Sequence, residues 1–262
     1  LPVLAVLVLA SYFNLGSAGA EELRTPCGGS GALKILLPAG ALIDGKNCEG
    51  DVSIPNSVKI IGEGAFRGAK KIGTIQLPES LVEVGAYAFY QSSLRGSLNI
   101  PKSVQQIKAY AFASTNISNV TPEVSFVYLG DSAFAQNLML TSAILPPANH
   151  FGAGIFSYTP ALKSLLFKDG ITLLPEYVAS GSGLVEVNLP STLQEISRGA
   201  FKKSNVELVQ VNSDSIFIQE EAFANTPLTA LSTPTVGIRT CCGAFSGTKI
   251  RELRIAEGQK IL

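Results

Sequence analysis

A pattern of 13 residues recurs three times without gaps in the first half of this chain. The copies are IPNSVKIIGEGAF at 54–66, LPESLVEVGAYAF at 77–89 and IPKSVQQIKAYAF at 100–112, and their starting points are evenly spaced. A fixed period of roughly 20 to 50 residues is typical of solenoids, in which one supersecondary unit stacks on copies of itself. The repeat therefore predicts a solenoid with a period of about 22 to 23 residues.

The repeat continues through the rest of the chain when the residue that opens each unit is taken as position zero. The units then open at Ile54, Leu77, Ile100, Val120, Leu145, Phe167, Leu189, Val211, Thr233 and Ile255. The steps are regular, except for one of 20 before Val120 and one of 25 after it, so we interpret that unit as locally shifted. Position minus two is usually apolar as well, which is the alternation of a strand with one buried face.

An aromatic residue about twelve positions after position zero is predicted to fill the core of nearly every unit. These core anchors are Phe66, Phe89, Phe112, Phe134, Phe156, Phe201, Phe223 and Phe245. The unit that opens at Phe167 has Tyr177-Val178-Ala179 there instead. Because Gly64-Ala65-Phe66 and its copies are too short for a helix, we expect a tight turn or one turn of 3₁₀ helix. The expected architecture is mostly β, with one long parallel sheet on one face and short turns on the other.

These offsets resemble the BspA-like class of leucine-rich repeats, whose unit looks like I-P-x-S-V-x-x-I-G-x-x-A-F followed by an apolar strand. The resemblance covers about residues 33–262 and is weakest between Val120 and Ala179. It implies a secreted or surface-displayed protein of a mucosal bacterium or microbial eukaryote that adheres to host proteins or other cells. The implied ligand is a protein or a cell-surface glycoprotein.

The first residues have the pattern of a secretory signal. An uncharged apolar run, LPVLAVLVLASYF, is followed by small residues that end in Ala18-x-Ala20. This favours a signal peptide over residues 1–20, with its start missing and cleavage after Ala20. The alternative is a membrane anchor that has lost its first half, but the 13 apolar residues are too few to span a bilayer. We therefore expect an extracellular or cell-surface location.

The segments on either side of the regular repeats are predicted as follows. Residues 21–48 form an N-terminal cap and a degenerate first coil, in which Gly40-Ala41-Leu42 echoes Gly64-Ala65-Phe66. Residues 49–262 form about nine repeats. Because IAEGQKIL at 255–262 matches IPNSVKII at 54–61, we expect the last coil to be truncated and the natural protein to continue, where a membrane anchor could follow.

The four cysteines fall into two pairs. Cys27 and Cys48 flank the degenerate first coil, and a disulfide between them is favoured over two buried thiols in an oxidising compartment. Cys241 and Cys242 are sequence neighbours, closer together than usual disulfide geometry allows. We expect them to be unpaired or to bond partners outside the given chain, with a strained vicinal bond as the alternative.

The composition argues against several classes of function. The net charge is zero and no basic stripe typical of nucleic-acid binders is visible, so no nucleic-acid partner is predicted. A catalytic triad, a Cys-His pair or a histidine metal site would each need His150, the single histidine, which we expect in a turn or semi-buried position. No glycine-rich phosphate loop precedes a helix. We predict no cofactor, no metal and no enzymatic activity.

The candidate binding face is the exposed row at position minus one. It contains Ser53, Gln76, Asn99, Asn119, Ile144, Leu166, Asn188, Gln210, Ser232 and Arg254, and position minus three adds Asp51, Thr74, Ser97, Ser142, Ser164, Glu186 and Glu252. Two interpretations remain open. The row either binds a protein or glycan around an apolar centre at Ile144 and Leu166, or its amides only ladder along the sheet and the two apolar residues are misassigned by a register slip.

Asn116 and Asn119 both begin N-glycosylation sequons, and Asn116, expected in the turn before a strand, is the better acceptor.

The favoured function is a non-enzymatic module that binds proteins or cell surfaces. The rivals are a structural spacer for a missing domain and a carbohydrate-active enzyme on a parallel β-helix, which would need clustered Asp, Arg or Lys at matching offsets. We expect specificity to lie where the repeat is least faithful, between Val120 and Ala179.

Overall fold

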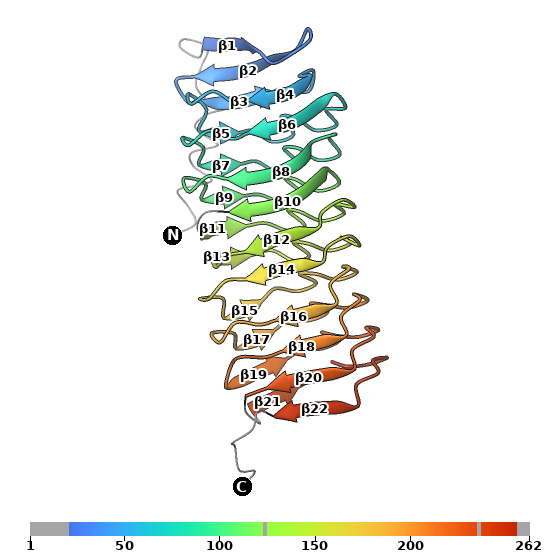
Figure 1. Ribbon diagram of the computed structural model, residues 1–262. Coiled ribbons are helices and arrows are strands. Elements are labelled where there is room, and N and C mark those ends of the chain that lie inside the picture. The colour runs from blue at the N-terminus through green and yellow to red at the C-terminus, as the bar shows by residue number, and fades with distance from the viewer. Residues whose placement is uncertain (1–20, 123–124, 235–236, 256–262) are drawn as a thin grey trace.

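The chain folds into an elongated solenoid of stacked coils (Figure 1). The computed structural model describes residues 21–122, 125–234 and 237–255, so the predicted signal peptide and the residues after 255 lie outside the described part. Within those ranges the chain forms 22 strands and no helix. The predicted leucine-rich-repeat solenoid is confirmed.

The first strand face is the one that the repeat predicts. Its strands are parallel and begin at least three residues before position zero, so the apolar residue at minus two lies within each strand. They are β4 (Gly50–Ser53), β6 (Ile72–Gln76), β8 (Arg95–Ile100), β10 (Asn116–Pro122), β12 (Ser142–Leu145), β14 (Ser164–Phe167), β16 (Glu186–Asn188), β18 (Leu208–Gln210), β20 (Ala230–Thr233) and β22 (Glu252–Ile255).

A second strand face, which the sequence does not predict, lies beside the first (Figure 1). Its strands are β3 (Ala41–Asp44), β5 (Ile60–Ile61), β7 (Glu83–Val84), β9 (Gln106–Ile107), β11 (Phe126–Leu129), β13 (Ala148–Phe151), β15 (Leu173–Leu174), β17 (Glu195–Ile196), β19 (Ser215–Ile218) and β21 (Gly237–Thr240). Five of these strands have two residues, too few for the alternation that signals a strand in sequence.

The third side of each coil, called here the turn face, is the predicted tight turn. Its backbone groups also bond from coil to coil: the Phe66 N–H donates to the Ala88 carbonyl at 2.7 Å, and the Gly68 N–H donates to the Tyr90 carbonyl at 2.8 Å. Two backbone positions in each turn have positive φ, at Gly64 (60°) and Gly68 (70°) in the first regular coil. Glycine adopts this conformation without a Cβ clash, which explains its frequency there.

A column of stacked phenylalanine rings runs through the core. The column contains the buried Phe66, Phe89, Phe112, Phe134, Phe156, Phe201 and Phe223, and the half-buried Phe245. Neighbouring rings are nearly parallel, with centroids 4.9 Å apart for Phe89 and Phe112. The column is interrupted at Ala179, where Phe167 approaches from β14 and meets the Phe201 ring edge-on at 6.3 Å. A larger side chain on the strand thus compensates for the missing ring in the turn.

The fourth unit is regular once its register is known. Thr121 pairs with Asn99 and Pro122 pairs with Ile100, so this unit opens at Pro122 and the assignment to Val120 is wrong by two residues. The steps on either side of Pro122 then match those of the other units, and Phe134 falls at plus twelve. A proline at position zero hid the repeat, because position zero is apolar and aliphatic in most other units.

The coil in which both strand faces are interrupted lies two coils further along and opens at Phe167. The second strand face breaks between β13 and β15. The first breaks between β14 and β16 and also between β6 and β8, so it is not the one long sheet that the repeat predicts. The turn face stays bonded across the break: the Tyr158 N–H donates to the Ser180 carbonyl at 2.7 Å. The coil that lacks a phenylalanine in its turn is therefore also the coil where both strand ladders are interrupted.

The N-terminal segment covers the open end of the solenoid. Strand β1 (Glu21–Pro26) pairs antiparallel with β2 (Ala32–Leu37), which pairs antiparallel with β3. Strand β3 places Leu42 beside Ile61, so the proposed echo of Gly64-Ala65-Phe66 is in the wrong register. The predicted Cys27–Cys48 disulfide is present, with Cα atoms 5.0 Å apart.

Candidate binding face

The strand pairing fixes which residues share one register position of the first strand face, called here the outer row. The outer row contains Ser53, Gln76, Asn99, Thr121, Ile144, Leu166, Asn188, Gln210, Ser232 and Arg254. It differs from the expected row in one member, since Thr121 replaces Asn119. Leu166 is 49% exposed and Ile144 is partly exposed, so neither is placed on this face by a register slip.

A second row runs beside the outer row at position minus three. It contains Asp51, Thr74, Ser97, Asn119, Ser142, Ser164, Glu186, Leu208, Ala230 and Glu252. Leu208, which is not among the residues expected in this row, is 42% exposed. Its offset from Val211 is the same as that of Glu186 from Leu189, so the repeat could have identified it.

Between β8 and β12, polar side chains within each row form hydrogen bonds from one strand to the next. The Asn119 Nδ2 donates to Ser97 Oγ at 3.1 Å, and Ser142 Oγ donates to Asn119 Oδ1 at 2.5 Å. In the outer row, Thr121 Oγ1 donates to Asn99 Oδ1 at 2.7 Å. This stretch has the ladder that one of the two interpretations predicts, and its polar groups are already partnered.

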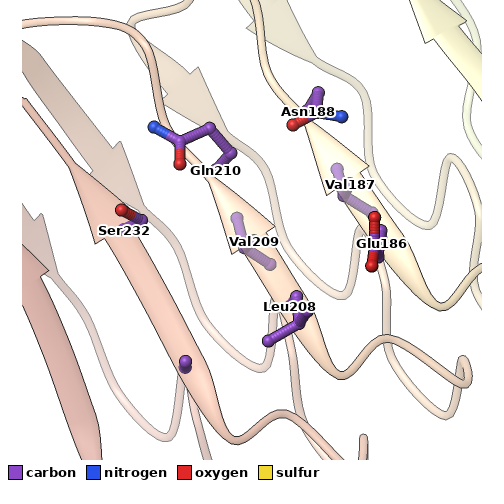
Figure 2. Close-up of a pocket in the computed structure, with 8 residues that line it drawn as sticks. Glu186, Val187, Asn188, Leu208, Val209, Gln210 and Ser232 are labelled. Atoms are coloured by element: carbon purple, nitrogen blue, oxygen red, sulfur yellow. The ribbon is translucent and has the colours of Figure 1, made fainter.

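Strands β16, β18 and β20 form a shallow hollow of about 240 Å³ (Figure 2). Asn188 and Gln210 stand side by side in the outer row, with Glu186 and Leu208 below them, while Val187 and Val209 are buried. Within the described ranges, no hydrogen bond involves the side chain of Glu186, Asn188 or Ser232. Unlike the ladder, the hollow offers free polar groups beside an exposed leucine, which is the chemistry of a binding surface.

The carboxylate of Asp51 lies at the N-terminal end of the second row. Its Oδ1 accepts the Thr74 N–H at 2.8 Å, and this hydrogen bond holds the pKa of Asp51 below its ordinary value of 3.8. A carboxyl whose pKa is lower in the folded state stabilises the fold fully above its unfolded pKa, and that contribution is lost as the pH falls through the folded pKa.

We predict that Asp51→Asn removes a pH-dependent part of the stability. The free energy of unfolding of the native chain should exceed that of the variant near neutral pH, and the difference should shrink as the pH falls below about 4. Urea unfolding of both proteins over this range tests the prediction. A difference that stays constant with pH would mean that charge on Asp51 is unimportant.

His150 does not occupy the expected turn or semi-buried position. It lies exposed on β13, with its ring stacked on Tyr128 at a centroid distance of 5.0 Å. The His150 ring is therefore part of the exposed surface of the second strand face, where it packs on Tyr128. No cluster of three or more His, Cys, Asp or Glu that could hold a metal ion occurs in residues 21–122, 125–234 and 237–255.

The structure also describes the two glycosylation sequons and the second cysteine pair. Asn116 is exposed and is the first residue of β10, not part of the preceding turn. The side chain of Asn119 is held in the ladder, so glycosylation at Asn116 stays the better prediction. Cys241 and Cys242 are unpaired, and a hydrogen bond with Cys242 raises the pKa of the Cys241 thiol.

Comparison with known sequences decides the family. Residues 46–163 and 149–262 match the BspA type leucine rich repeat region, in six copies. The chain belongs to this family. No curated protein matches the sequence. In the part of this BspA-type repeat protein that the structure describes, no helix has the length and apolar character needed to cross a membrane.

Three solved structures are similar to this chain at low sequence identity. A leucine rich cell surface protein from Faecalibacterium prausnitzii is 19% identical, with a TM-score of 0.40 over 81% of this chain. This chain spans 61% of that protein. A leucine-rich repeat protein from Bacteroides ovatus is 15% identical, with a TM-score of 0.36 over 88% of this chain and 91% of that one. The pneumococcal vaccine antigen PcpA is 18% identical, with a TM-score of 0.43 over 86% and 46% of the two chains.

Proposed function

We propose that this BspA-type repeat protein is an extracellular or cell-surface module that binds a protein partner through the first strand face, over β14 to β20. The observation that carries the proposal is the contrast within that face. In the ladder between β8 and β12 the polar side chains bond to one another, whereas Glu186, Asn188 and Ser232 in the hollow have no side-chain hydrogen bond to any residue that the structure describes. Leu166 on β14 and Leu208 on β18 add exposed apolar surface in the coils before and after β16.

The location part of the proposal rests on two features of the chain. The first 20 residues have the pattern of a secretory signal. The Cys27–Cys48 disulfide is typical of proteins that fold in an oxidising compartment. The two features together favour display outside the cell.

A binding role fits the hollow better than catalysis does. Glycoside hydrolysis usually needs two carboxyl groups that flank the scissile bond. Among the described residues that line the hollow, Glu186 is the single carboxylate. A spacer role would explain the ladder, but it gives no reason for an exposed leucine on each side of unpartnered polar groups.

The proposal predicts that Leu166→Asp with Leu208→Asp abolishes partner binding. The native ectodomain is first used to select a ligand from a panel of purified matrix and cell-surface proteins, and its Kd is then measured. The double variant should bind at least about 30-fold more weakly, because a central apolar anchor contributes about 2 kcal/mol or more. Both positions are exposed, so the fold should be retained.

The matched control is Thr74→Asp with Gln76→Asp, which adds the same two charges to exposed positions of the same two rows. Binding by this control should be unchanged. Equal loss in both variants would indicate a general charge effect. If the native protein retains no member of the panel, the spacer interpretation is favoured.

A further inference from the structure

The turn face contains a feature that the repeat alone does not require. The positive-φ positions of the turn are occupied by glycine in several coils, including Gly64, Gly154 and Gly199 at the first position and Gly181 at the second. Tyrosine takes these positions at Tyr87, Tyr110, Tyr158 and Tyr177, with φ between 53° and 55°. A bulky side chain is strained in this conformation, so glycine would serve the fold better.

Four of the seven tyrosines of the chain occupy these strained positions. Since other coils close the same turn with glycine, the tyrosines are not needed to form it. Gln, Ser, Lys, Glu and Asn take the same positions in other coils, so the backbone strain by itself does not distinguish the tyrosines. Their distinguishing feature is the arrangement of their rings.

The first tyrosines form a rigid aromatic stack. The Tyr110 ring is parallel to Tyr87, with centroids 5.1 Å apart, and Tyr90 meets Tyr87 edge-on. The guanidinium of Arg67 lies 5.5 Å from the centroid of Tyr87. The stack therefore holds Tyr110 at its C-terminal end with one ring face turned toward the following coils.

The row of rings stops after Tyr110 and resumes at Tyr177. The two intervening coils have Ser132 and Gly154 at the same backbone position, so two rings are missing. The result is an open slot of about 340 Å³, which Tyr158 borders from the second position of its turn. Three coil steps separate its end walls, a distance of about 14 Å at the usual strand spacing.

The polar groups of the slot are suited to hydroxyl groups of a ligand. Asp131 Oδ1 accepts the Ala153 N–H at 2.7 Å, and Oδ2 is bonded to no other described residue. Ser132 and the phenol of the 61% exposed Tyr158 add hydroxyls that can donate and accept. The carboxylate disfavours an anionic ligand, because like charges repel.

An extended peptide is a poor fit to the same slot. An extended peptide can bind by pairing with the free backbone groups of a sheet edge. Here the turn backbone is already bonded from coil to coil, as in the 2.8 Å bond from the Ser132 N–H to the Ala153 carbonyl. The ligand must instead offer flat apolar faces to the tyrosine rings and hydroxyls to Asp131 and Ser132. A pyranose ring has both.

We propose that the slot between Tyr110 and Tyr177 binds a neutral pyranose unit of a glycan. The C–H face of the sugar stacks on a tyrosine ring, and the sugar hydroxyls donate to Asp131 and exchange hydrogen bonds with Ser132. This site lies on the turn face and is separate from the protein-binding surface proposed on the first strand face.

The test uses an array of neutral and sialylated mammalian and plant glycans, followed by titration of the best neutral oligosaccharide. Because the chain has no tryptophan, intrinsic tyrosine fluorescence reports the titration directly. Tyr177→Gly should weaken binding at least tenfold without lowering the melting temperature, since glycine relieves the strained backbone. Asp131→Asn should also weaken binding, by removing the charged acceptor.

Lys203→Gly is the matched control, because Lys203 has the same positive φ (58°) two coils beyond Tyr158. It should bind the sugar as the native chain does, and so should the Leu166→Asp, Leu208→Asp variant. Failure of all neutral glycans to bind at millimolar concentration overturns the proposal, as does a preference for sialylated glycans or undiminished binding by Tyr177→Gly. Loss of sugar binding in the strand-face variant would place the site on the other face.

Discussion

Replacing Phe112 with alanine is expected to lower the free energy of unfolding by about 3–5 kcal/mol. Phe112 is fully buried, and its ring is sandwiched between Phe89 at 4.9 Å and Phe134 at 5.4 Å. The substitution removes a large apolar side chain, leaves a cavity and breaks two stacked pairs at once. Chemical denaturation followed by circular dichroism measures the loss.

The position of Phe112 within the solenoid adds a second expected effect. Each coil contacts only its neighbours, so a weak coil can separate the unfolding of the coils before it from those after it. We expect a broadened or biphasic transition for Phe112→Ala. Phe245→Ala is the control, because Phe245 is half-buried and stacks on one described ring, Phe223. A loss as large for Phe245→Ala as for Phe112→Ala would show that burial between two stacked rings adds no stability at Phe112.

Removing the Cys27–Cys48 disulfide is expected to cost about 3 kcal/mol of stability. The bond closes a loop with a sequence separation of 21 residues, for which the loss of chain entropy in the unfolded state gives this magnitude. The loss should also loosen the N-terminal hairpin, since the bridge joins the end of β1 to the segment before β4. Unfolding of the Cys27→Ser, Cys48→Ser variant, compared with the native chain, measures the effect.

The second cysteine pair supplies the control for this experiment. Cys241 and Cys242 are unpaired, and Cys242 is exposed, so their replacement by serine should change the stability by less than about 0.5 kcal/mol. Reductant should destabilise the native chain and leave the Cys27→Ser, Cys48→Ser variant unchanged. If reductant has no effect on the native chain, the disulfide does not contribute to stability.

The strand positions and the core were predictable because burial repeats with the coil. An apolar residue at position minus two indicates the core-facing side of a strand. A phenylalanine near plus twelve indicates a side chain that packs in the core. The second strand face was not predictable, since Ile60–Ile61 and its equivalents are too short to show alternation. The register at Pro122 was missed for a similar reason, because one proline at position zero outweighed the pattern around it.

The two proposed binding surfaces were also predictable only in part. Strand alternation was enough to assign nine of the ten residues of the outer row. It could not separate the ladder around Asn119 from the hollow around Asn188, since hydrogen bonding depends on the neighbour one coil away. The tyrosine slot could have been noticed in sequence, because Tyr110 and Tyr177 share the offset of Gly64.

The repeat of the sequence by itself determined the solenoid, its parallel strands and its phenylalanine column. It could do so because stacking demands the same buried side chains in every coil. The tertiary structure alone decided that Phe167 meets the Phe201 ring edge-on, that both strand ladders break at the coil of Ala179, and that Asp131 lines a slot bordered by tyrosines. Those facts depend on contacts between residues at least one coil apart, whose geometry no local pattern specifies.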